Sequence, residues 1–489
     1  MSPQDLSGAH SRLAGPADRP EGAPVSPQDL SGAHSRLAGS ADRPEGAPLS
    51  PQDGAEPADS GYRFGRRGTV ATFAGLCLLM VFDFADRMVL AALLPAIRAD
   101  WQISDTTAGL LGSILTLGMV LFAFPAAALV GRLGRVRSAA AMGVLWSLAS
   151  AAGAFAQNVG QLLASRALVG VGEAGYAPAS YAWISSAFPR RRRQFALGVF
   201  SAAQPIGMAA GVVLGGFIAT HWGWQHALGF VAFPGLVVAL WLLRGRDWVE
   251  PRPAAGAAMG SRLAILRLPA LRLAYLGGAL AALQWVPLLF FLPSWLERQH
   301  GLPGTSASLL AGGVLLLPIL GVPLGGWLMD RWNRRDEAAK LVWPIAAGSF
   351  ATLCYLAAFT VADGLPAQYT LIVLGAFVGS SGGTGPLALT QELVPPVLRA
   401  FSGTCSVVAV HLLGSVPGPL LVGALSDRLG LSQALLLVLL AAGSAQVLAL
   451  AAALRHYRRD LAALQPAAPR AGRGALPLPA SPLQPPSPS

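Results

Sequence analysis

The sequence has few charged residues for its length. Only 12% of its 489 residues are Asp, Glu, Lys or Arg, whereas soluble proteins usually carry about 25%. Lysine is nearly absent, since Lys340 is the only one among 35 basic residues. Because 53% of the residues are hydrophobic and the mean hydropathy is +0.53, the composition predicts a membrane protein.

Motifs for enzyme chemistry are also lacking. The three cysteines, Cys77, Cys354 and Cys405, lie far apart in apolar stretches without metal-ligand spacing, and we expect them to be packing residues. The sequence contains no HExxH zinc motif, no nucleophile elbow and no Walker loop. We therefore expect no enzyme activity, no metal, no cofactor and no direct use of ATP.

Long apolar stretches recur along the sequence, each long enough to cross a bilayer as a helix. Many contain glycine or proline, which membrane helices tolerate because neighbouring helices satisfy the freed backbone groups. The sequence therefore predicts an all-α membrane protein with 12 transmembrane helices. Their approximate limits are 70–97, 106–130, 138–156, 161–187, 194–219, 225–243, 271–296, 305–329, 339–361, 367–392, 400–426 and 431–454.

The arginines are concentrated in alternate loops between these stretches. Short basic loops mark the cytoplasmic side of a membrane protein, and only Arg98, Arg298 and Arg428 fall on the opposite side. This distribution predicts a multi-pass protein of the inner (cell) membrane with both termini in the cytoplasm. It also argues against a nucleic-acid partner despite the net charge of +11, because the charge is divided among the loops.

The two ends of the chain differ in composition from the apolar stretches. Residues Ser2–Val25 recur almost unchanged as Ser26–Leu49, and this segment has almost no large apolar side chains. Such a segment cannot bury enough surface to offset the entropy of ordering it. We therefore expect a disordered tail over 1–62, and a second one over the Pro-rich residues 456–489.

A central loop, 245–270, divides the twelve stretches six and six. Related basic loops follow the second and eighth stretches, GRLGRVRS at 131–138 and GGWLMDRWNRR at 325–335. This repetition predicts two six-helix bundles, 63–244 and 271–455, with the substrate site between them near the midplane. The basic loops are either solvated topological signals or a conformational latch. The latch would consist of Arg132, Arg135, Asp330, Arg331 and Arg335.

Three ionisable residues interrupt the first apolar stretch. Asp83, Asp86 and Arg87 lie within VFDFADRMVL near its middle, where a charge costs about 2.5–3.5 kcal/mol on insertion scales. A pair between Asp83 and Arg87, four residues apart on one helical face, would be a purely structural solution. It leaves Asp86 unexplained, so we expect Asp86 and Arg87 to face a cavity or partner charges.

The fourth stretch, SRALVGVGEAGYAPASY, carries Arg166 and Glu173 on one helical face, about 10 Å apart along the axis. That separation is long for a direct pair, so we expect each residue to find its partner on another helix, and the first stretch is the obvious supplier. Its glycines, 170–175, spell G-x-G-x-x-G, but no strand precedes them. We interpret them as a packing face and not as a dinucleotide site.

A few polar side chains elsewhere are candidates for a cavity lining. Gln204, Gln284 and Trp285 lie in the fifth and seventh stretches. His411, in the eleventh, is either a packing residue, a proton relay or a substrate contact. We expect Gln204, Trp285 and His411 to contribute to substrate binding.

The motifs quoted above resemble the major facilitator superfamily. Within it, ADRMVLAALLPAIRADWQISDTTAGLL, SRALVGVGEAGYAPAS and HLLGSVPGPLLVGALSDRLG are similar to the spinster branch. The similarity runs from about Gly68 to Leu454. Two positions depart from the pattern: Gly131 stands where the branch usually has Asp, and Gly414-Ser415 stands where it often has Gly-Asp.

The resemblance implies transport of lysophospholipids or sphingosine phosphate with proton coupling. It implies that Asp86 and Glu173 are the protonation sites, and that Arg87 and Arg166 steer their charge or bind an anionic headgroup. The implied partners are membrane lipids, a small amphipathic substrate and protons, with the protein acting as a monomer.

The sequence thus predicts a secondary active transporter in which the two halves rock about a central site. A drug or organic-anion antiporter of the same superfamily is the first alternative. A lipid scramblase, a polytopic membrane enzyme and a non-transporting receptor are alternatives of other classes.

Overall fold

Helices make up the structure of this protein, a computed structural model that describes residue 62 and residues 64–245, 247, 264–336, 338–395 and 398–464. The N-terminal half contains α2 (Gly65–Trp101), α3 (Asp105–Leu133), α4 (Arg135–Ala154), α5 (Val159–Glu173), α6 (Tyr176–Ala187), α7 (Arg190–Trp222) and α8 (Trp224–Leu242). The C-terminal half contains the 3-10 turn η1 (Ala264–Arg267), α10 (Pro269–His300), α11 (Gly304–Leu316), α12 (Pro318–Asn333), α13 (Ala339–Thr360), α14 (Leu365–Ser381), α15 (Thr384–Glu392), α16 (Arg399–Val410), the π-helical turn η3 (His411–Ser415), α17 (Pro417–Leu429) and α18 (Leu431–Leu464).

Nine helical stretches in this part of the chain are long and apolar enough to cross a membrane. They comprise α3, α7, α8, α10, α13 and α18, together with the runs α11–α12, α14–α15 and α16–α17. The three other predicted spans coincide with α2, α4 and the pair α5–α6. The all-helical prediction is therefore confirmed for the described residues.

Proline explains why several spans are broken into two helices. A proline at position i cannot donate to the carbonyl at i−4, and α5 ends just before Ala174, four residues ahead of Pro178. The same spacing relates the end of α14, followed by Gly382, to Pro386. These are the fourth spans of the two halves, so the matching breaks support the predicted internal repeat.

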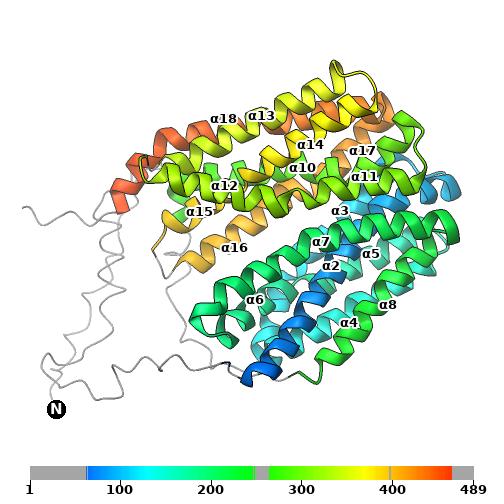
Figure 1. Cartoon of the computed structure of the whole chain (residues 1–489), viewed down its shortest axis with the longest axis horizontal. Helices are drawn as coiled ribbons and strands as arrows, with labels where there is room; N and C mark the ends of the chain where they lie inside the picture. The colour runs from blue at the N-terminus through cyan, green and yellow to red at the C-terminus, as the bar shows by residue number, and fades with distance from the viewer. Residues whose placement is uncertain are drawn as a thin grey trace, which may run out of the picture. The chain divides into compact units, whose positions relative to one another are not determined.

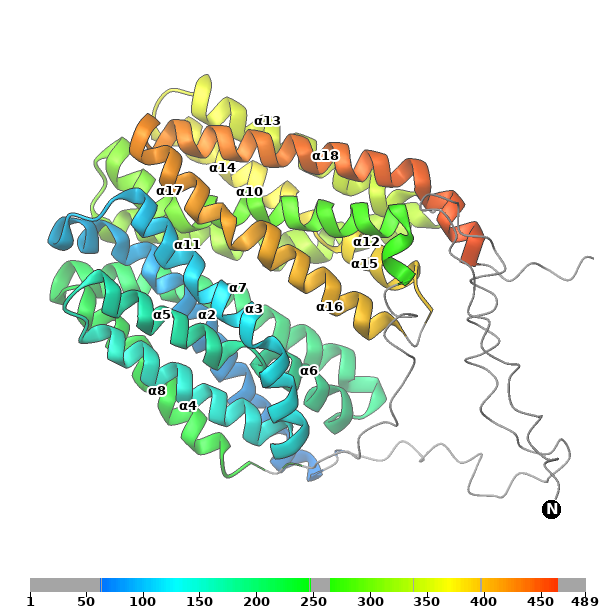
Figure 2. The ribbon, with the colours of Figure 1, turned by 180° about the vertical axis from the view of Figure 1, so that it is seen from behind.

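The two halves contact each other chiefly through α3 with α17, α7 with α11 and α2 with α10. In Figures 1 and 2 these helices converge at one end, whereas α6 and α16 diverge at the other. Small residues allow the approach: a Cβ at Gly109 of α3 would lie 2.8 Å from the carbonyl carbon of Pro419 of α17. We call the converging end, where α2 finishes and α3 begins, the outer end, and the opposite end with the basic loops the inner end.

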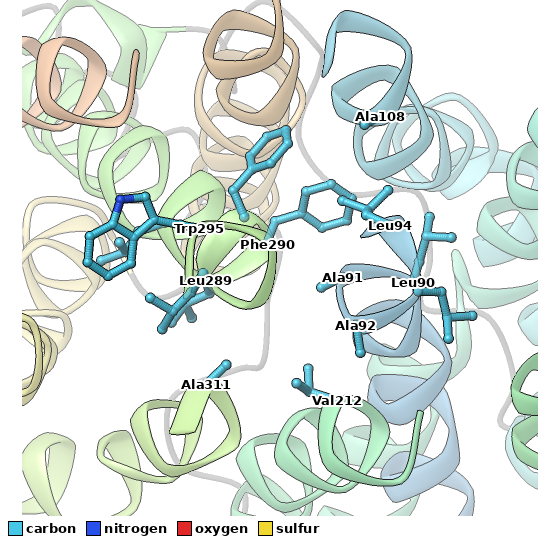
Figure 3. Close-up of a cluster of buried hydrophobic side chains, with 14 of the residues drawn as sticks. Leu90, Ala91, Ala92, Leu94, Ala108, Val212, Leu289, Phe290, Trp295 and Ala311 are labelled. Carbon is cyan, nitrogen blue, oxygen red and sulfur yellow. The ribbon is translucent and has the colours of Figure 1, made fainter. Parts of the chain in front are cut away.

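A hydrophobic core joins the halves towards the outer end. Figure 3 shows Leu94 of α2 beside Phe290 of α10, with Val212 of α7 and Ala311 of α11 below them. Leu94 and Phe290 are at most 5% exposed. Burial of such side chains stabilises the contact by about 1.5–3 kcal/mol each.

The chain ends and the central loop lie largely outside the described residues. Pro48–Ala462 form one compact unit, and the predicted N-terminal tail, 1–62, is described at Tyr62 alone. The helix α18 continues to Leu464, nine residues past the predicted end of the C-terminal bundle at 455. Its last turns are anchored because Asp460 Oδ2 accepts a hydrogen bond of 2.9 Å from the backbone N–H of Ala270.

Candidate functional site

Five ionisable side chains meet between α2 and α5, and we call them the central ion cluster: Asp83, Asp86, Arg87, Arg166 and Glu173. Asp83 lies halfway along the 37-residue α2. Apart from Arg87, each of these residues is at most 1% exposed. Charges buried this deeply persist only when they are paired and hydrogen-bonded.

Arg87 joins two carboxyls. Its Nε lies 3.0 Å from Oδ1 of Asp83, one turn earlier on α2, and 3.0 Å from Oε2 of Glu173 at the end of α5. A second nitrogen donates to Oδ2 of Asp83 at 3.3 Å. The guanidinium also stands over the ring of Phe84, 4.5 Å from its centroid. The side chain remains 18% exposed, so it combines buried partners with access from outside the cluster.

Arg166 forms a second, fully enclosed pair. Its guanidinium donates to Oδ2 of Asp86 at 3.1 Å, to the backbone carbonyl of Asp86 at 3.2 Å and to Oγ of Ser150 at 2.9 Å. The Ser150 hydroxyl donates in turn to the other oxygen of Asp86. Both expected partnerships are confirmed, since Arg166 and Glu173 find their counter-charges on the first span. Arg166 has no exposure through which to reach a substrate in this conformation.

Glu173 differs from Asp86 in how it is held. Among the described residues, neither of its oxygens accepts a hydrogen bond, although Arg87 lies 3.0 Å away. It is the last residue of α5, next to the break at Ala174. Its carboxyl is therefore held by charge and by the packing of α5.

The glycines around Glu173 pack helices, as the sequence predicted. A Cβ at Gly172 would lie 2.7 Å from the backbone nitrogen of Trp146, and one at Gly170 would lie 2.9 Å from the carbonyl carbon of Leu115. These contacts bring α5 against α3 and α4, which carries Ser150 into the cluster. The dinucleotide interpretation remains rejected on structural context.

A cavity of about 560 Å³ lies mainly among C-terminal helices, with α7 forming one wall. Gln204 of α7 and Trp285 of α10 line it, as predicted, and Trp285 is 44% exposed. The amide of Gln204 donates to Tyr181 Oη at 3.3 Å. Most of the lining is apolar, including Leu288, Val314 and further aliphatic side chains. Its described lining does not include the central ion cluster, so charge and apolar volume are separate.

His411 opens the π-helical turn η3, where the backbone N–H of Val416 donates to its carbonyl at 2.8 Å. Such turns are frequent at functional sites. Within the described residues, Nδ1 of His411 is buried without a hydrogen-bond partner. The ring does not belong to the described lining of the cavity.

A second group of charges closes the outer end, and the sequence analysis did not identify it. Asp105, at the start of α3, receives Arg298 of α10 through two hydrogen bonds of 2.8 Å and Ser426 of α17 at 2.6 Å. Arg98 of α2 pairs with the same carboxylate. Asp427 of α17 accepts from the backbone N–H groups of Asp105 and Thr106 at 2.7 and 2.9 Å. We call these residues the Asp105 network; they join both halves.

The predicted latch at the inner end is not joined across the halves in this conformation. In the part of the chain that the structure describes, Arg132, Asp330, Arg331 and Arg335 are exposed and form no ion pair. Arg135 donates to Oγ of Ser186 at 2.8 Å, within its own half. Asp247, after α8, accepts from the N–H groups of Val136 and Arg137 and so caps α4.

Sequence reasoning missed two features that a signal could have shown. Asp83 was weighed as a structural partner of Arg87, yet the structure places it in the same group as Glu173. The outer arginines Arg98 and Arg298 stand out as exceptions on the arginine-poor side, whereas their partner Asp105 and the neighbouring Asp427 do not. Their meeting depends on residues more than 300 positions apart.

Known proteins share this architecture. A bacterial homolog of the human lysosomal transporter spinster, solved in an inward-facing and unoccupied conformation, superposes with a TM-score of 0.69 at 22% identity, covering 81% of this chain and 98% of that one. The D-xylose-proton symporter gives a TM-score of 0.63 at 16% identity, over 78% and 96% of the two chains. These likenesses establish the fold.

Sequence comparisons identify relatives at greater similarity. The human protein spinster homolog 1 is 28% identical over 386 residues, 73% of this chain and 72% of its own length. An MFS-type efflux pump of Mycolicibacterium smegmatis is 29% identical over 422 residues, 82% of this chain and 96% of its own length. The Major Facilitator Superfamily profile matches residues 76–404, which is about two thirds of the sequence. The chain therefore belongs to the Major Facilitator Superfamily, as a spinster-like, multi-pass membrane transporter and not an enzyme.

Proposed function

We propose that this protein is a proton-coupled secondary active transporter of an amphipathic anion, of the lysophospholipid or sphingolipid kind, working by alternating access. The observation that carries the proposal is the central ion cluster, in which three carboxyls share two arginines. Asp86 and Glu173 are the proposed proton-coupling residues, with Asp83 as the third member of the group.

The charge balance of the cluster supports proton coupling. With every group ionised, three carboxylates and two guanidiniums leave one excess negative charge. A net charge in an apolar interior is costly, and one bound proton removes it. Burial favours the neutral form of a carboxyl, whereas a neighbouring guanidinium favours the charged form. A rocking motion that separated Arg87 from Glu173 would therefore link proton uptake to the orientation of the halves.

The arrangement of charge and apolar volume supports an amphipathic substrate. The side chain of Arg87 is 18% exposed, and a guanidinium binds phosphate or carboxylate through two parallel hydrogen bonds. The 560 Å³ cavity beyond Gln204 and Trp285 offers apolar walls for a hydrocarbon chain. His411, whose buried Nδ1 is unpartnered among the described residues, is a further candidate contact for the headgroup. Arg166, being enclosed, acts through Asp86.

The proposal includes twelve membrane-spanning helices, six in each half. Nine of these spans are the apolar stretches described above, and the other three are α2, α4 and the α5–α6 pair. The lengths of these three suit a bilayer when they pack among the other helices. In this proposal the inner end and both termini lie in the cytoplasm, which the basic loops at that end support. Under this orientation, the Asp105 network closes the extracytoplasmic side and the described conformation faces the cytoplasm.

A second candidate function is export of a drug or small organic anion. The observation that favours it is the similarity to the M. smegmatis protein described as an efflux pump. Competition distinguishes the two: lysophospholipids should compete with the substrate of a lipid transporter, and small polar anions should compete with that of an exporter. A scramblase would move lipid without a gradient and without saturable counterflow.

The experiment is uptake of a fluorescent lysophospholipid by proteoliposomes under an imposed pH gradient. We expect Asp86→Asn and Glu173→Gln to abolish gradient-driven accumulation, with Glu173→Gln retaining exchange without a gradient. Asp363→Asn, at an exposed acid between α13 and α14, is the matched control and should behave like the wild type. Full gradient-driven accumulation by both cluster variants would reject the proposed coupling.

A further inference from the structure

A basic cavity lies between the first turns of α2 and the end of α8. Its volume is about 590 Å³. Arg66 and Arg67 line it from α2, and Arg244 lines it from the turn after α8. All three arginines are exposed and form no ion pair among the described residues.

The cavity lies next to a tight crossing of α2 with the last turn of α8. One turn above it, a Cβ at Gly75 would lie 3.0 Å from Cε3 of Trp241 and 2.8 Å from Cδ2 of Leu242. Beyond this crossing α8 ends, and the cavity lies between the first turns of α2 and the turn that follows α8. None of the described residues that line it is acidic. Three positive charges therefore face one space with no acidic residue among the described residues of its lining.

Apolar side chains continue from this cavity along the outward faces of the same two helices. Val70 and Leu78 of α2 are 44% and 50% exposed, and Val237 and Trp241 of α8 are 50% and 45% exposed. A membrane protein surface of this kind contacts acyl chains, and an exposed tryptophan at a helix end is typical of the headgroup level. The site thus presents positive charge at one level and apolar surface directly beyond it.

We propose that this cavity binds the phosphate headgroup of an anionic membrane phospholipid, with its acyl chains lying along α2 and α8. Free phosphate would use the arginines alone, whereas a phospholipid uses both the arginines and the adjoining apolar faces. Basic pockets between transmembrane helices on the cytoplasmic side are suited to such headgroups. Because α2 carries the central ion cluster, the bound lipid would rest on the helix that bears the proposed coupling residues.

The test is native mass spectrometry of the full-length protein in detergent, titrated with phosphatidylglycerol or with phosphatidylcholine. We expect tighter binding of phosphatidylglycerol, and each arginine contributes about fivefold. The double variant Arg67→Gln/Arg244→Gln should therefore bind phosphatidylglycerol about 25-fold more weakly. The matched control, Arg455→Gln/Arg459→Gln, removes two exposed arginines from α18 and should leave the affinity unchanged.

Two further results complete the test. Arg67→Lys/Arg244→Lys, which keeps the charge, should retain most of the binding and shows that the site itself is intact. Millimolar inorganic phosphate should not displace the lipid. The proposal would be overturned if Arg67→Gln/Arg244→Gln and the control Arg455→Gln/Arg459→Gln lost the same amount of affinity for phosphatidylglycerol. Equal affinity of the wild type for the two lipids, or displacement of the lipid by inorganic phosphate, would also overturn it.

Discussion

The outer and inner ends of this transporter use the same residue types in opposite states. At the outer end, Asp105 binds Arg298 and Ser426 from the other half, and Asp427 caps α3 from across the same boundary. At the inner end, Asp330 and the arginines beside it are exposed and, among the described residues, form no ion pair. Among the described residues, acidic and basic side chains therefore connect the two halves at the outer end, where the helices converge, and not at the inner end.

The comparison shows how little is needed to close one end. The outer contact combines the Asp105 network with the apolar layer around Leu94 and Phe290 (Figure 3). The carboxylate of Asp105 is 4% exposed, but its arginines are 33% and 41% exposed. Such partly solvated ion pairs are weak individually, so the closed end can be released during a transport cycle.

The largest expected effect is that of Asp105→Ala. This change removes the shared acceptor of both arginines and of Ser426, and we expect it to disfavour closure of the outer end by about 2 kcal/mol, or about thirtyfold in population. Distances between spin labels on the outer ends of α3 and α17, measured by electron resonance, should lengthen. A distance distribution identical to that of the wild type would show that the apolar layer alone holds this end.

A smaller effect is expected from Arg298→Gln, for which the molecule supplies its own control. Arg298 crosses between the halves, whereas Arg98 pairs with Asp105 within the N-terminal half. Arg298→Gln should disfavour closure of the outer end by about 1 kcal/mol, which lowers the closed population about fivefold. The same label distances should report this change, and Arg98→Gln should change them less. If the two variants behave alike, the network does not act as a link between halves.

Asp427→Asn should have a smaller effect again. The side chain keeps its shape and one acceptor but loses the charge that faces the N-terminus of α3, an interaction that contributes about 0.3–1 kcal/mol. We expect a slight lengthening of the α3–α17 distance and unchanged substrate affinity. Loss of substrate binding would instead place Asp427 in the transport site.

The smallest effect on this conformation is expected at the inner end. Because Asp330 is exposed and unpaired among the described residues, Asp330→Asn should change the free energy of unfolding by less than about 0.5 kcal/mol. Its transport turnover should nevertheless fall, since the predicted latch would form only in the opposite conformation. Unchanged turnover together with unchanged stability would remove Asp330 from the latch.

The sequence identified the central ion cluster because charges inside an apolar stretch are conspicuous. The seven-residue spacing of Arg166 and Glu173 also indicated that their partners lie on the first span, which the structure confirms. The detailed pairing was not accessible, since either arginine could have faced Asp83 or Asp86. The tertiary fold pairs Arg87 with Glu173 and Arg166 with Asp86.

The Asp105 network escaped prediction for a different reason. Charged residues at the ends of membrane helices are common and usually solvated, so Asp105 and Asp427 carried no signal of their own. The tertiary fold brings them together across 322 positions of sequence. The positions of the helix breaks at Ala174 and Gly382 were not predicted either. Each break lies four residues before a proline, Pro178 or Pro386, which accounts for its position.

The most direct test of the account is the number of protons that move with each substrate molecule. In proteoliposomes with a pH-sensitive dye, we predict about one proton per molecule for the wild type, as the single excess charge of the central ion cluster requires. Glu173→Gln should exchange substrate with no proton movement. Proton movement in Glu173→Gln equal to that of the wild type would contradict the account.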